Sequence, residues 1–486
     1  IENEIATLKF KNPATPPQTL FKPAENWFVG DVDLHFDADR LLFSSIGTHG
    51  RWQIFEIKTD GTGLRQVTQG DEADVDNYDP MYLPDGRIVF YSSSTFQGVP
   101  CVGGKDYVAN LHLMNPDGSG VRRLCFDQDN DWCPTLLPNG RVLYLRWEYT
   151  DSAHYFSRVL MSMNPDGTGQ TEFYGSGSYW PNSLFYARPL PGSATQFAGI
   201  VTGHHGAARM GELILFDAAQ GRQETRGAIQ RIPGHGKPVA NSIKDRLVDA
   251  SWPKFLHPYP ITGKHFLVSC KPSAKALWGI YWVDVYDNLI LLQEEPGHAL
   301  FEPVPLRPTP KPPAIPDKVK LDEKQARVYL HDIYTGVGLR GVPRGTVKSL
   351  RVFQYEYSYR NMGGHYLVGM EGPWDVRRII GTVPLQEDGS AFFYVPANTP
   401  VAVQPLDAEG KALQQMRSWF VGMPGENVSC VGCHEQQNQG SSLLSAKAAT
   451  RSAVQPTPWR GPKRGFSFVR EVQPVLDQYC AGCHDG

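Results

Sequence analysis

Two related stretches decide the fold: DPMYLPDGRIVF at residues 79–90 and CPTLLPNGRVLY at residues 133–144. Each contains an Asp-Gly or Asn-Gly pair, which supplies the positive φ that a tight hairpin turn needs. The β-branched and aromatic residues around the pair are typical of strands. A second marker follows each stretch, NPDGSG at 115–120 and NPDGTG at 164–169. A repeat of about 50 residues built this way predicts the four-stranded blades of a β-propeller.

Weaker copies of the repeat continue along the chain. They begin at Trp180 and Trp252, and each of these tryptophans precedes a proline. We expect the segment 301–304 to open a last copy that the N-terminal residues complete, because such closure leaves no exposed sheet edge. Five to seven blades fit the sequence, and we favour six, within residues 1–318.

The rest of the chain divides into two parts. The proline-rich run 303–316 is typical of a stiff linker. Residues 319–440 predict a β-sandwich-like domain, with a strand over 350–357 and a hairpin over 381–395. Residues 441–486 predict a linker and then a short helix, because Pro474 suits a first helical turn and apolar residues recur one turn apart. The fold class expected for the whole chain is mainly β.

Two short motifs carry chemistry, CVGCH at 430–434 and CAGCH at 480–484. Cys-x-x-Cys-His attaches c-type haem, since the two thiols add to the porphyrin's vinyl groups and the histidine ligates the iron. A redox dithiol is the alternative, but no βαβ pattern surrounds either motif; half a zinc site is another, but each pair carries its own histidine. The sequence therefore predicts two covalently bound haem c groups. Their predicted attachment and ligand residues are Cys430, Cys433, His434, Cys480, Cys483 and His484.

Further ligands are harder to assign. His204 and His205 lie between glycines, where backbone freedom could aim an imidazole at a haem face; the alternative is a turn held by polar hydrogen bonds. Weaker candidates of the same kind are His235, His257, Met416 and Met423, and methionine near haem is more often a packing residue. The acidic loop 71–79 is either a calcium site or a solvated turn.

Composition excludes some functions and suggests a compartment. Net charge is −3 and no long basic run occurs, so nothing favours a nucleic-acid partner. No apolar run reaches the length of a membrane span. Haem c is attached outside the cytoplasm, so we expect a periplasmic or extracellular protein whose export signal is not present in this chain. The remaining cysteines could then pair, but the sequence does not decide how. They are Cys101, Cys125, Cys133 and Cys270.

The middle of the chain resembles a known family. The resemblance rests on DGSAF at 388–392, MRS at 416–418, PGE at 424–426 and SCVGCH at 429–434, and GHHG at 203–206 fits as well. Together these are similar to the hydrazine synthase alpha subunit and its wider family of propeller–cytochrome proteins. The propeller repeats also resemble those of TolB-like proteins.

The resemblance implies chemistry on small nitrogen compounds at haem sites. In that family a tyrosine four positions after the first motif histidine ligates the iron, and the histidine binds zinc. Asn438 stands at that position here, so we expect His434 to ligate iron in the ordinary way.

Three functions remain open. We favour a di-haem cytochrome that transfers electrons in the cell envelope, working with a redox protein partner or other subunits. The alternatives are a haem enzyme of the hydrazine synthase type and a cell-surface assembly module that carries haems. A homo-oligomer is one form that such a module could take. Iron coordination distinguishes the electron-transfer cytochrome from the haem enzyme. Two strong ligands on each iron indicate electron transfer, whereas one open face indicates catalysis.

Overall fold

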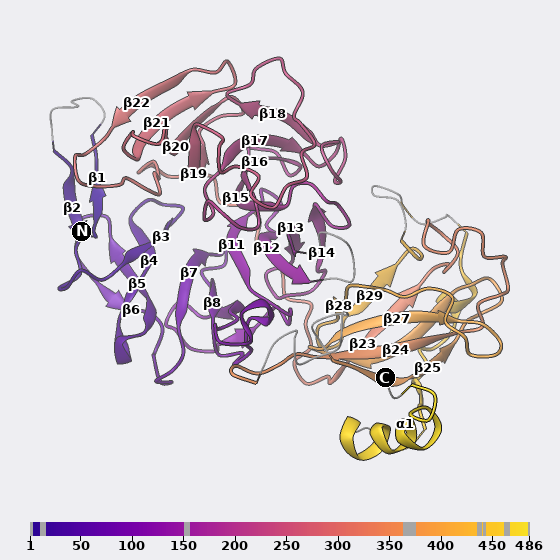
Figure 1. Ribbon diagram of the computed structural model, residues 1–486. Helices are drawn as coiled ribbons and strands as arrows, with labels where there is room; N and C mark the ends of the chain where they lie inside the picture. Colours follow the sequence, from indigo (N-terminus) through magenta and orange to yellow (C-terminus); the bar gives the residue numbers. More distant parts are fainter. Residues whose placement is uncertain are drawn as a thin grey trace.

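The computed structural model describes residues 3–9, 16–149, 156–362, 376–434, 440, 444–460 and 467–484. Within these residues the chain is mainly β, with one short α-helix near its C-terminal end, α1 (Gln473–Tyr479). Figure 1 shows a broad ring of sheets joined on one side to a smaller body of β-strands, with α1 below that body. Asn438 lies outside the described residues.

Among the described residues, the ring contains five antiparallel units of four strands, which we number in chain order; a parallel contact of Arg158 with Ser183 joins units 3 and 4 into one sheet. Unit 1 holds β3 (Val29–Leu34), β4 (Arg40–Ile46), β5 (Trp52–Lys58) and β6 (Arg65–Gln66). Unit 2 holds β7 (Asn77–Tyr82), β8 (Ile88–Ser92), β9 (Asn110–Met114) and β10 (Arg122–Arg123). Unit 3 holds β11 (Asp131–Leu136), β12 (Val142–Tyr149), β13 (Phe156–Met163) and β14 (Thr171–Tyr174). Unit 4 holds β15 (Ser183–Pro189), β16 (Gln196–Thr202), β17 (Glu212–Asp217) and β18 (Ala228–Ile232). Unit 5 holds β19 (Lys254–Pro260), β20 (His265–Lys271), β21 (Gly279–Asp284) and β22 (Leu289–Gln293).

The first strand of every unit carries a β-bulge at its centre. In each bulge one residue adopts a positive φ near 50°, and a sixth residue does the same after unit 5. These residues are Asp31, Asp79, Cys133, Tyr186, His257 and Glu302, and together they line a small cavity of about 70 Å³. Bulges re-aim side chains, and here they turn one side chain per unit into the same space.

The six residues also tie neighbouring units together. The Asp79 carboxylate accepts a hydrogen bond from the backbone N–H of Cys133 at 3.1 Å. The Glu302 carboxylate accepts one from the N–H of Val32 at 2.8 Å, which joins the end of the ring to its beginning. The segment 301–304 was expected to open a sixth blade; it lies in the corresponding place but forms no strand among the described residues. The N-terminal strands β1 (Ile5–Thr7) and β2 (Gln18–Phe21) pair with each other instead, so the blade number stays a prediction.

The smaller body is a sandwich of two sheets around one core. One sheet has the order β26 (Ala391–Pro396), β23 (Gln325–Leu330), β29 (Asn427–Cys430). The other has the order β28 (Phe420–Val421), β27 (Pro400–Leu406), β24 (Ser349–Glu356), β25 (Val376–Pro384), β30 (Thr457–Pro458). Alternate residues of both sheets are buried in the shared core, as period-2 patterning requires.

The hairpin predicted over 381–395 is wrong. β25 pairs with β24, whereas β26 pairs with β23 in the opposite sheet. The turn between them crosses from sheet to sheet, so Val383 and Phe393 reach the core from opposite sides. Alternation alone gives the same pattern for a hairpin and for such a crossing, which is why the sequence did not separate them.

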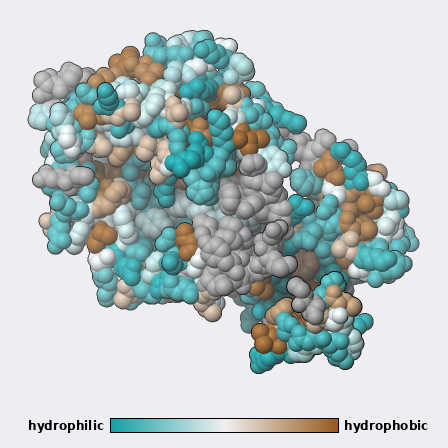
Figure 2. Space-filling view, in the orientation of Figure 1, coloured by the Kyte–Doolittle hydropathy of each residue, from teal (hydrophilic) through white to brown (hydrophobic). Residues whose placement is uncertain are grey.

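The short helix predicted near the C-terminal end is confirmed. A π-helical turn over Phe468–Val472 precedes α1, and Pro474 lies in the first turn as expected. Its apolar side chains are exposed: Phe468, Val469, Val475, Leu476 and Tyr479. Figure 2 shows hydrophobic surface at this lower end of the molecule. In the described part of the chain, no helix has the length and apolar character to cross a membrane.

Candidate functional site

The first Cys-x-x-Cys-His motif is held by the sandwich through its backbone. β29 runs parallel to β23 and carries Cys430 at its end. The following loop accepts hydrogen bonds from the segment 331–338: His331 N–H to Cys430 O at 2.9 Å, and Gly338 N–H to Cys433 O at 3.0 Å. Gly432 packs closely on this segment, since a Cβ there would lie 2.2 Å from the Thr335 carbonyl oxygen. The motif loop therefore has a fixed position before any ligand binds.

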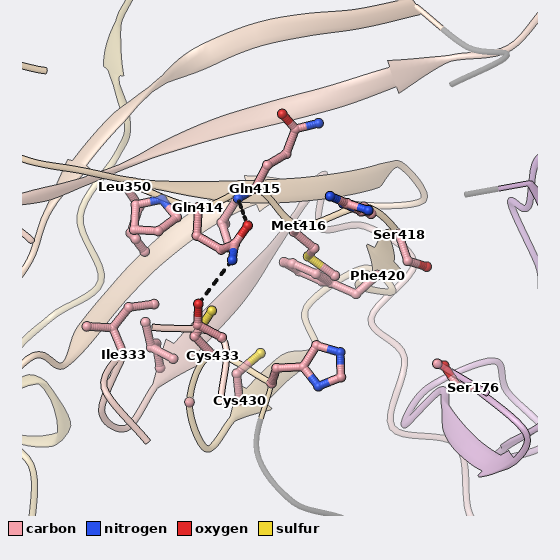
Figure 3. Close-up of a pocket in the computed structure, with 18 of the residues that line it drawn as sticks. Ser176, Ile333, Leu350, Gln414, Gln415, Met416, Ser418, Phe420, Cys430 and Cys433 are labelled. Carbon is pink, nitrogen blue, oxygen red and sulfur yellow. Dashed lines mark hydrogen bonds between the residues drawn. The ribbon is translucent and has the colours of Figure 1, made fainter. Parts of the chain in front are cut away.

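The motif opens into a cavity of about 620 Å³, within the usual size range of ligand pockets. Cys430, Cys433 and His434 all contribute to its wall. Figure 3 shows the two cysteines on one side of the cavity, opposite Gln414, Met416 and Phe420. Much of the lining is apolar and comes from the sandwich core. These residues are Val328, Leu330, Leu350, Phe393, Val403 and Phe420.

The ring supplies another part of the wall. The loop Ser176–Tyr179, which follows β14, lines the cavity, and Ser176 appears at its side in Figure 3. His434 is exposed and lies against this loop, with its Cε1 atom 3.8 Å from the place a Cβ on Gly177 would take. The cavity thus lies between the ring and the sandwich, and its walls come from segments that are far apart in the sequence.

Glu148, at the end of β12, is the acidic group of this wall. Its carboxylate forms an ion pair with Arg146 at 2.6 Å and accepts a hydrogen bond from the Ser418 hydroxyl at 3.4 Å. Only 7% of the Glu148 side chain is exposed, so the pairing compensates the cost of burying its charge. No motif in the sequence around Glu148 identifies it as a site residue, because its place in the wall depends on the contact between the ring and the sandwich.

The predicted further ligands are scattered. Met416 lines the cavity, whereas Met423 is fully buried elsewhere in the core between ring and sandwich. His204 and His205 are not among the cavity-lining residues; His205 pairs with Asp245 at 2.9 Å, and the His204 ring stands edge-on to Trp147.

The two weaker histidine candidates also lie away from the cavity. The backbone N–H of His235 donates to Asp287. His257 belongs to the small cavity at the ring centre, where burial lowers its pKa to about 3.

The acidic loop 71–79 does not gather its carboxylates. Asp76 pairs with Arg51 at 3.4 Å and accepts a hydrogen bond from the N–H of Trp52, while Asp71, Glu72 and Asp74 are exposed. A calcium ion in this loop stays a prediction. Cys125, Cys133 and Cys270 are free thiols, and the side chain of Cys101 lies outside the described part of the structure.

The second motif is placed differently. Cys480 follows α1 directly, with its N–H bonded to the Leu476 carbonyl at 2.8 Å. Cys480, Cys483 and His484 are all exposed, and α1 packs mainly on the π-helical turn before it. The chain therefore presents this motif to solvent, whereas it encloses the first one.

The first site fits a porphyrin. Two thiols stand on one side of a cavity whose walls are largely apolar, and a histidine adjoins them. Haem c needs this donor set, and its macrocycle favours an apolar enclosure with a few polar groups at the edge.

Comparisons with known proteins agree with this geometry. Residues 345–435 match the family model of the hydrazine synthase alpha subunit middle domain. The chain is 21% identical to hydrazine synthase subunit alpha of Kuenenia stuttgartiensis, in an alignment that covers 96% of this chain and 72% of that protein. The solved structure of Kuenenia stuttgartiensis hydrazine synthase aligns with 97% of this chain and 76% of its own, with a TM-score of 0.76 and 18% identity, so the two share a fold. A TolB from Acinetobacter baumannii aligns with 56% of this chain and 55% of its own at 11% identity, and its TM-score of 0.38 is too low to support more. The family model, the similarity along nearly the whole chain and the shared fold confirm the resemblance seen in the sequence: residues 345–435 match the middle domain of the hydrazine synthase alpha subunit family, and nearly the whole chain shares the fold of hydrazine synthase.

Proposed function

We propose that this protein is a haem c oxidoreductase of the hydrazine synthase type, and that the cavity between ring and sandwich is its reaction site. One observation carries the proposal: both thiols of the first motif open into a cavity that a second body of the protein completes. The porphyrin itself would fill much of this space, and the ring would then cover one side of the haem. The similarity to hydrazine synthase along nearly the whole chain favours an enzyme over the electron-transfer protein that the sequence suggested first.

Each part of the site has a role in this proposal. Cys430 and Cys433 would hold the porphyrin, and His434 would ligate its iron. When bound, the haem supplies a redox-active iron at which small nitrogen or oxygen compounds react. The apolar walls exclude water, and Glu148, held by Arg146 and Ser418, is positioned to accept or donate a proton at the cavity wall.

The exposed second motif suits electron exchange. Cys480, Cys483 and His484 would hold a haem at the surface, where a redox partner or another subunit can approach. The relative in Kuenenia stuttgartiensis is named as a subunit, which supports assembly with other chains as part of the proposal. Covalent haem implies that this takes place in the cell envelope.

The test uses the purified protein with both haems attached. Pyridine haemochrome analysis should find two haems per chain. Adding carbon monoxide to the reduced protein should shift the spectrum of one haem, and that shift should disappear in the Cys430→Ala/Cys433→Ala variant but persist in the Cys480→Ala/Cys483→Ala variant. If carbon monoxide shifts neither haem, the cavity offers no open iron and the enzymatic proposal fails.

A second prediction concerns Glu148. The infrared stretching frequency of iron-bound carbon monoxide responds to charges near the ligand. Glu148→Gln should move this band while the haem content stays at two per chain, because the amide keeps the shape of the side chain and removes its charge. The matched control is Glu387→Gln, whose side chain is 89% exposed. An unchanged band in Glu148→Gln would exclude Glu148 from the reaction site.

A further inference from the structure

A second group of ligand-type side chains lies buried beside the joint of ring and sandwich. Cys125 follows β10, Asp127 lies in the next loop, and Asp131 begins β11. One ligand atom from each lies within 4.8 Å of the other two. All three residues have 0% exposure, and this is the one such group of three among the described residues. None of them lines the haem cavity.

Each carboxylate accepts one hydrogen bond from a side-chain N–H. Asp127 Oδ1 accepts it from Trp419 Nε1 at 2.7 Å, and Asp131 Oδ2 accepts it from Asn110 Nδ2 at 2.8 Å. The other two oxygens, Asp127 Oδ2 and Asp131 Oδ1, are buried with no N–H or O–H donor, and the two carboxyls lie within hydrogen-bond reach of each other. Buried polar atoms are rarely left without a partner, so these two oxygens need either a shared proton or a bound cation.

Tyr144 gives an independent indication. It extends from β12 and is fully buried, and its hydroxyl has no other polar partner than the Cys125 sulfur, toward which it is directed. A phenolic oxygen, a thiol and two carboxylate oxygens therefore converge on one dry place.

The charges around the group are compatible with a divalent ion. Arg146 lies 3.5 Å from Asp127 and 2.6 Å from Glu148, and Arg123 also acts on both aspartates. Without an ion, a protonated Asp131 and a neutral Cys125 thiol leave two carboxylates facing two guanidinium groups. A divalent cation that displaces those two protons keeps the same balance, and buried charge is tolerated only when it is compensated in this way.

We propose that Cys125, Asp127 and Asp131 bind a zinc ion, with the Tyr144 hydroxyl completing four-fold coordination. Zinc binds thiolate as well as carboxylate ligands, and its structural sites are closed and four-coordinate. Calcium and magnesium take oxygen ligands and leave a thiol unused. The site is closed to solvent, and the ion enters as the chain folds. Through Asp127 and Trp419 it fixes the sandwich against the ring, and so holds the two bodies that enclose the haem cavity.

The alternative for these side chains is a proton shared by the two aspartates beside a neutral thiol. Zinc K-edge X-ray absorption of the unmodified protein, with its haems attached, distinguishes a bound zinc ion from a shared proton. The proposal expects one sulfur scatterer at about 2.3 Å and oxygens at about 2.0 Å. A preparation without protein-bound zinc, or with zinc that has no sulfur neighbour, overturns it. This measurement needs no variant, so it does not depend on any substitution folding.

Variants locate the ion. Elemental analysis should find about one zinc per chain attributable to this site, with haem iron counted separately. Cys125→Ser should lower that zinc at least tenfold, and so should Asp131→Asn. Cys270→Ser is the matched control. Cys270 is also a fully buried free thiol, but it belongs to no cluster of possible metal ligands among the described residues. Zinc bound elsewhere, for example through His434, would survive Cys125→Ser, and an unchanged zinc content in that variant overturns the proposal.

Discussion

Single buried carboxyls set part of the pH response of the ring. Asp33 lies beside the central cavity, and its carboxylate accepts the N–H of Tyr82 at 2.9 Å. Burial nevertheless raises the pKa of the Asp33 carboxyl from 3.8 to about 6, because the cost of burying its charge exceeds the opposing effect of this hydrogen bond. A carboxyl with a raised pKa stabilises the fold while it is protonated. Its contribution is therefore complete below about pH 4 and is lost as the pH rises through about 6.

Asp33→Asn should remove this dependence. The amide oxygen can still accept the Tyr82 N–H, but it cannot ionise. Relative to the unmodified protein, the variant should gain stability between pH 4 and pH 7, by about 3 kcal/mol at most. Urea unfolding at a series of pH values measures the difference. Asp322→Asn, at an exposed carboxyl, should show no such gain, and equal pH slopes for Asp33→Asn and the unmodified protein would contradict the prediction.

Among the elements, the two Cys-x-x-Cys-His loops share a sequence pattern but differ in their surroundings. Gly432 fits against the turn 332–335, where a Cβ would lie 2.2 Å from one carbonyl oxygen and 2.8 Å from the Asp332 carbonyl oxygen. Gly482 holds the same place in the second loop, and a Cβ there meets nothing within 4 Å. The difference follows from β29, which anchors the first loop to β23, whereas α1 leaves the second in solvent.

The two glycines therefore give a matched pair of substitutions. Gly432→Ala should displace the loop and cost about 1–3 kcal/mol, as overpacking does. Attachment of the proposed haem at Cys430 and Cys433 should then be poor. Gly482→Ala should leave stability and haem content unchanged. Mass spectrometry of haem-bearing peptides, together with thermal unfolding, measures both effects; equal haem loss in the two variants would show that the surroundings of Gly432 do not matter.

For the whole molecule, the sequence revealed local features better than contacts between distant segments. The hairpin turns at Gly86 and Gly140 have the positive φ that their Asp-Gly and Asn-Gly pairs predict, and strands begin directly after Trp180-Pro181-Asn182 and Trp252-Pro253. The first motif was found from its spacing alone. Glu148 was not found, because it reaches the cavity wall only through a contact between residues about 270 positions apart. The crossing between β25 and β26 was missed for the same reason, since strand alternation does not specify the partner strand.

The joint between ring and sandwich determines whether the cavity keeps its shape, and Trp419 is its central residue. Its indole N–H donates to the buried Asp127 carboxylate at 2.7 Å, and the Arg146 guanidinium lies 4.4 Å from its ring centre. Trp419→Phe keeps the aromatic ring but leaves a buried carboxylate oxygen without its donor, which costs about 1–3 kcal/mol.

Because the lost bond links the two bodies, the ring and the sandwich should also unfold less cooperatively. Circular dichroism should then follow the ring, and the haem absorbance should follow the sandwich. In the unmodified protein we expect the two denaturation curves to coincide; in Trp419→Phe the haem curve should shift to lower denaturant. Trp459→Phe, at a tryptophan that is 46% exposed, is the control and should change stability by less than about 0.5 kcal/mol. If the two curves still coincide in Trp419→Phe, the joint between ring and sandwich does not depend on this hydrogen bond. Other contacts across the joint, such as the hydrogen bond from the Gly169 N–H to Glu426 at 2.6 Å, are then enough to hold the cavity together.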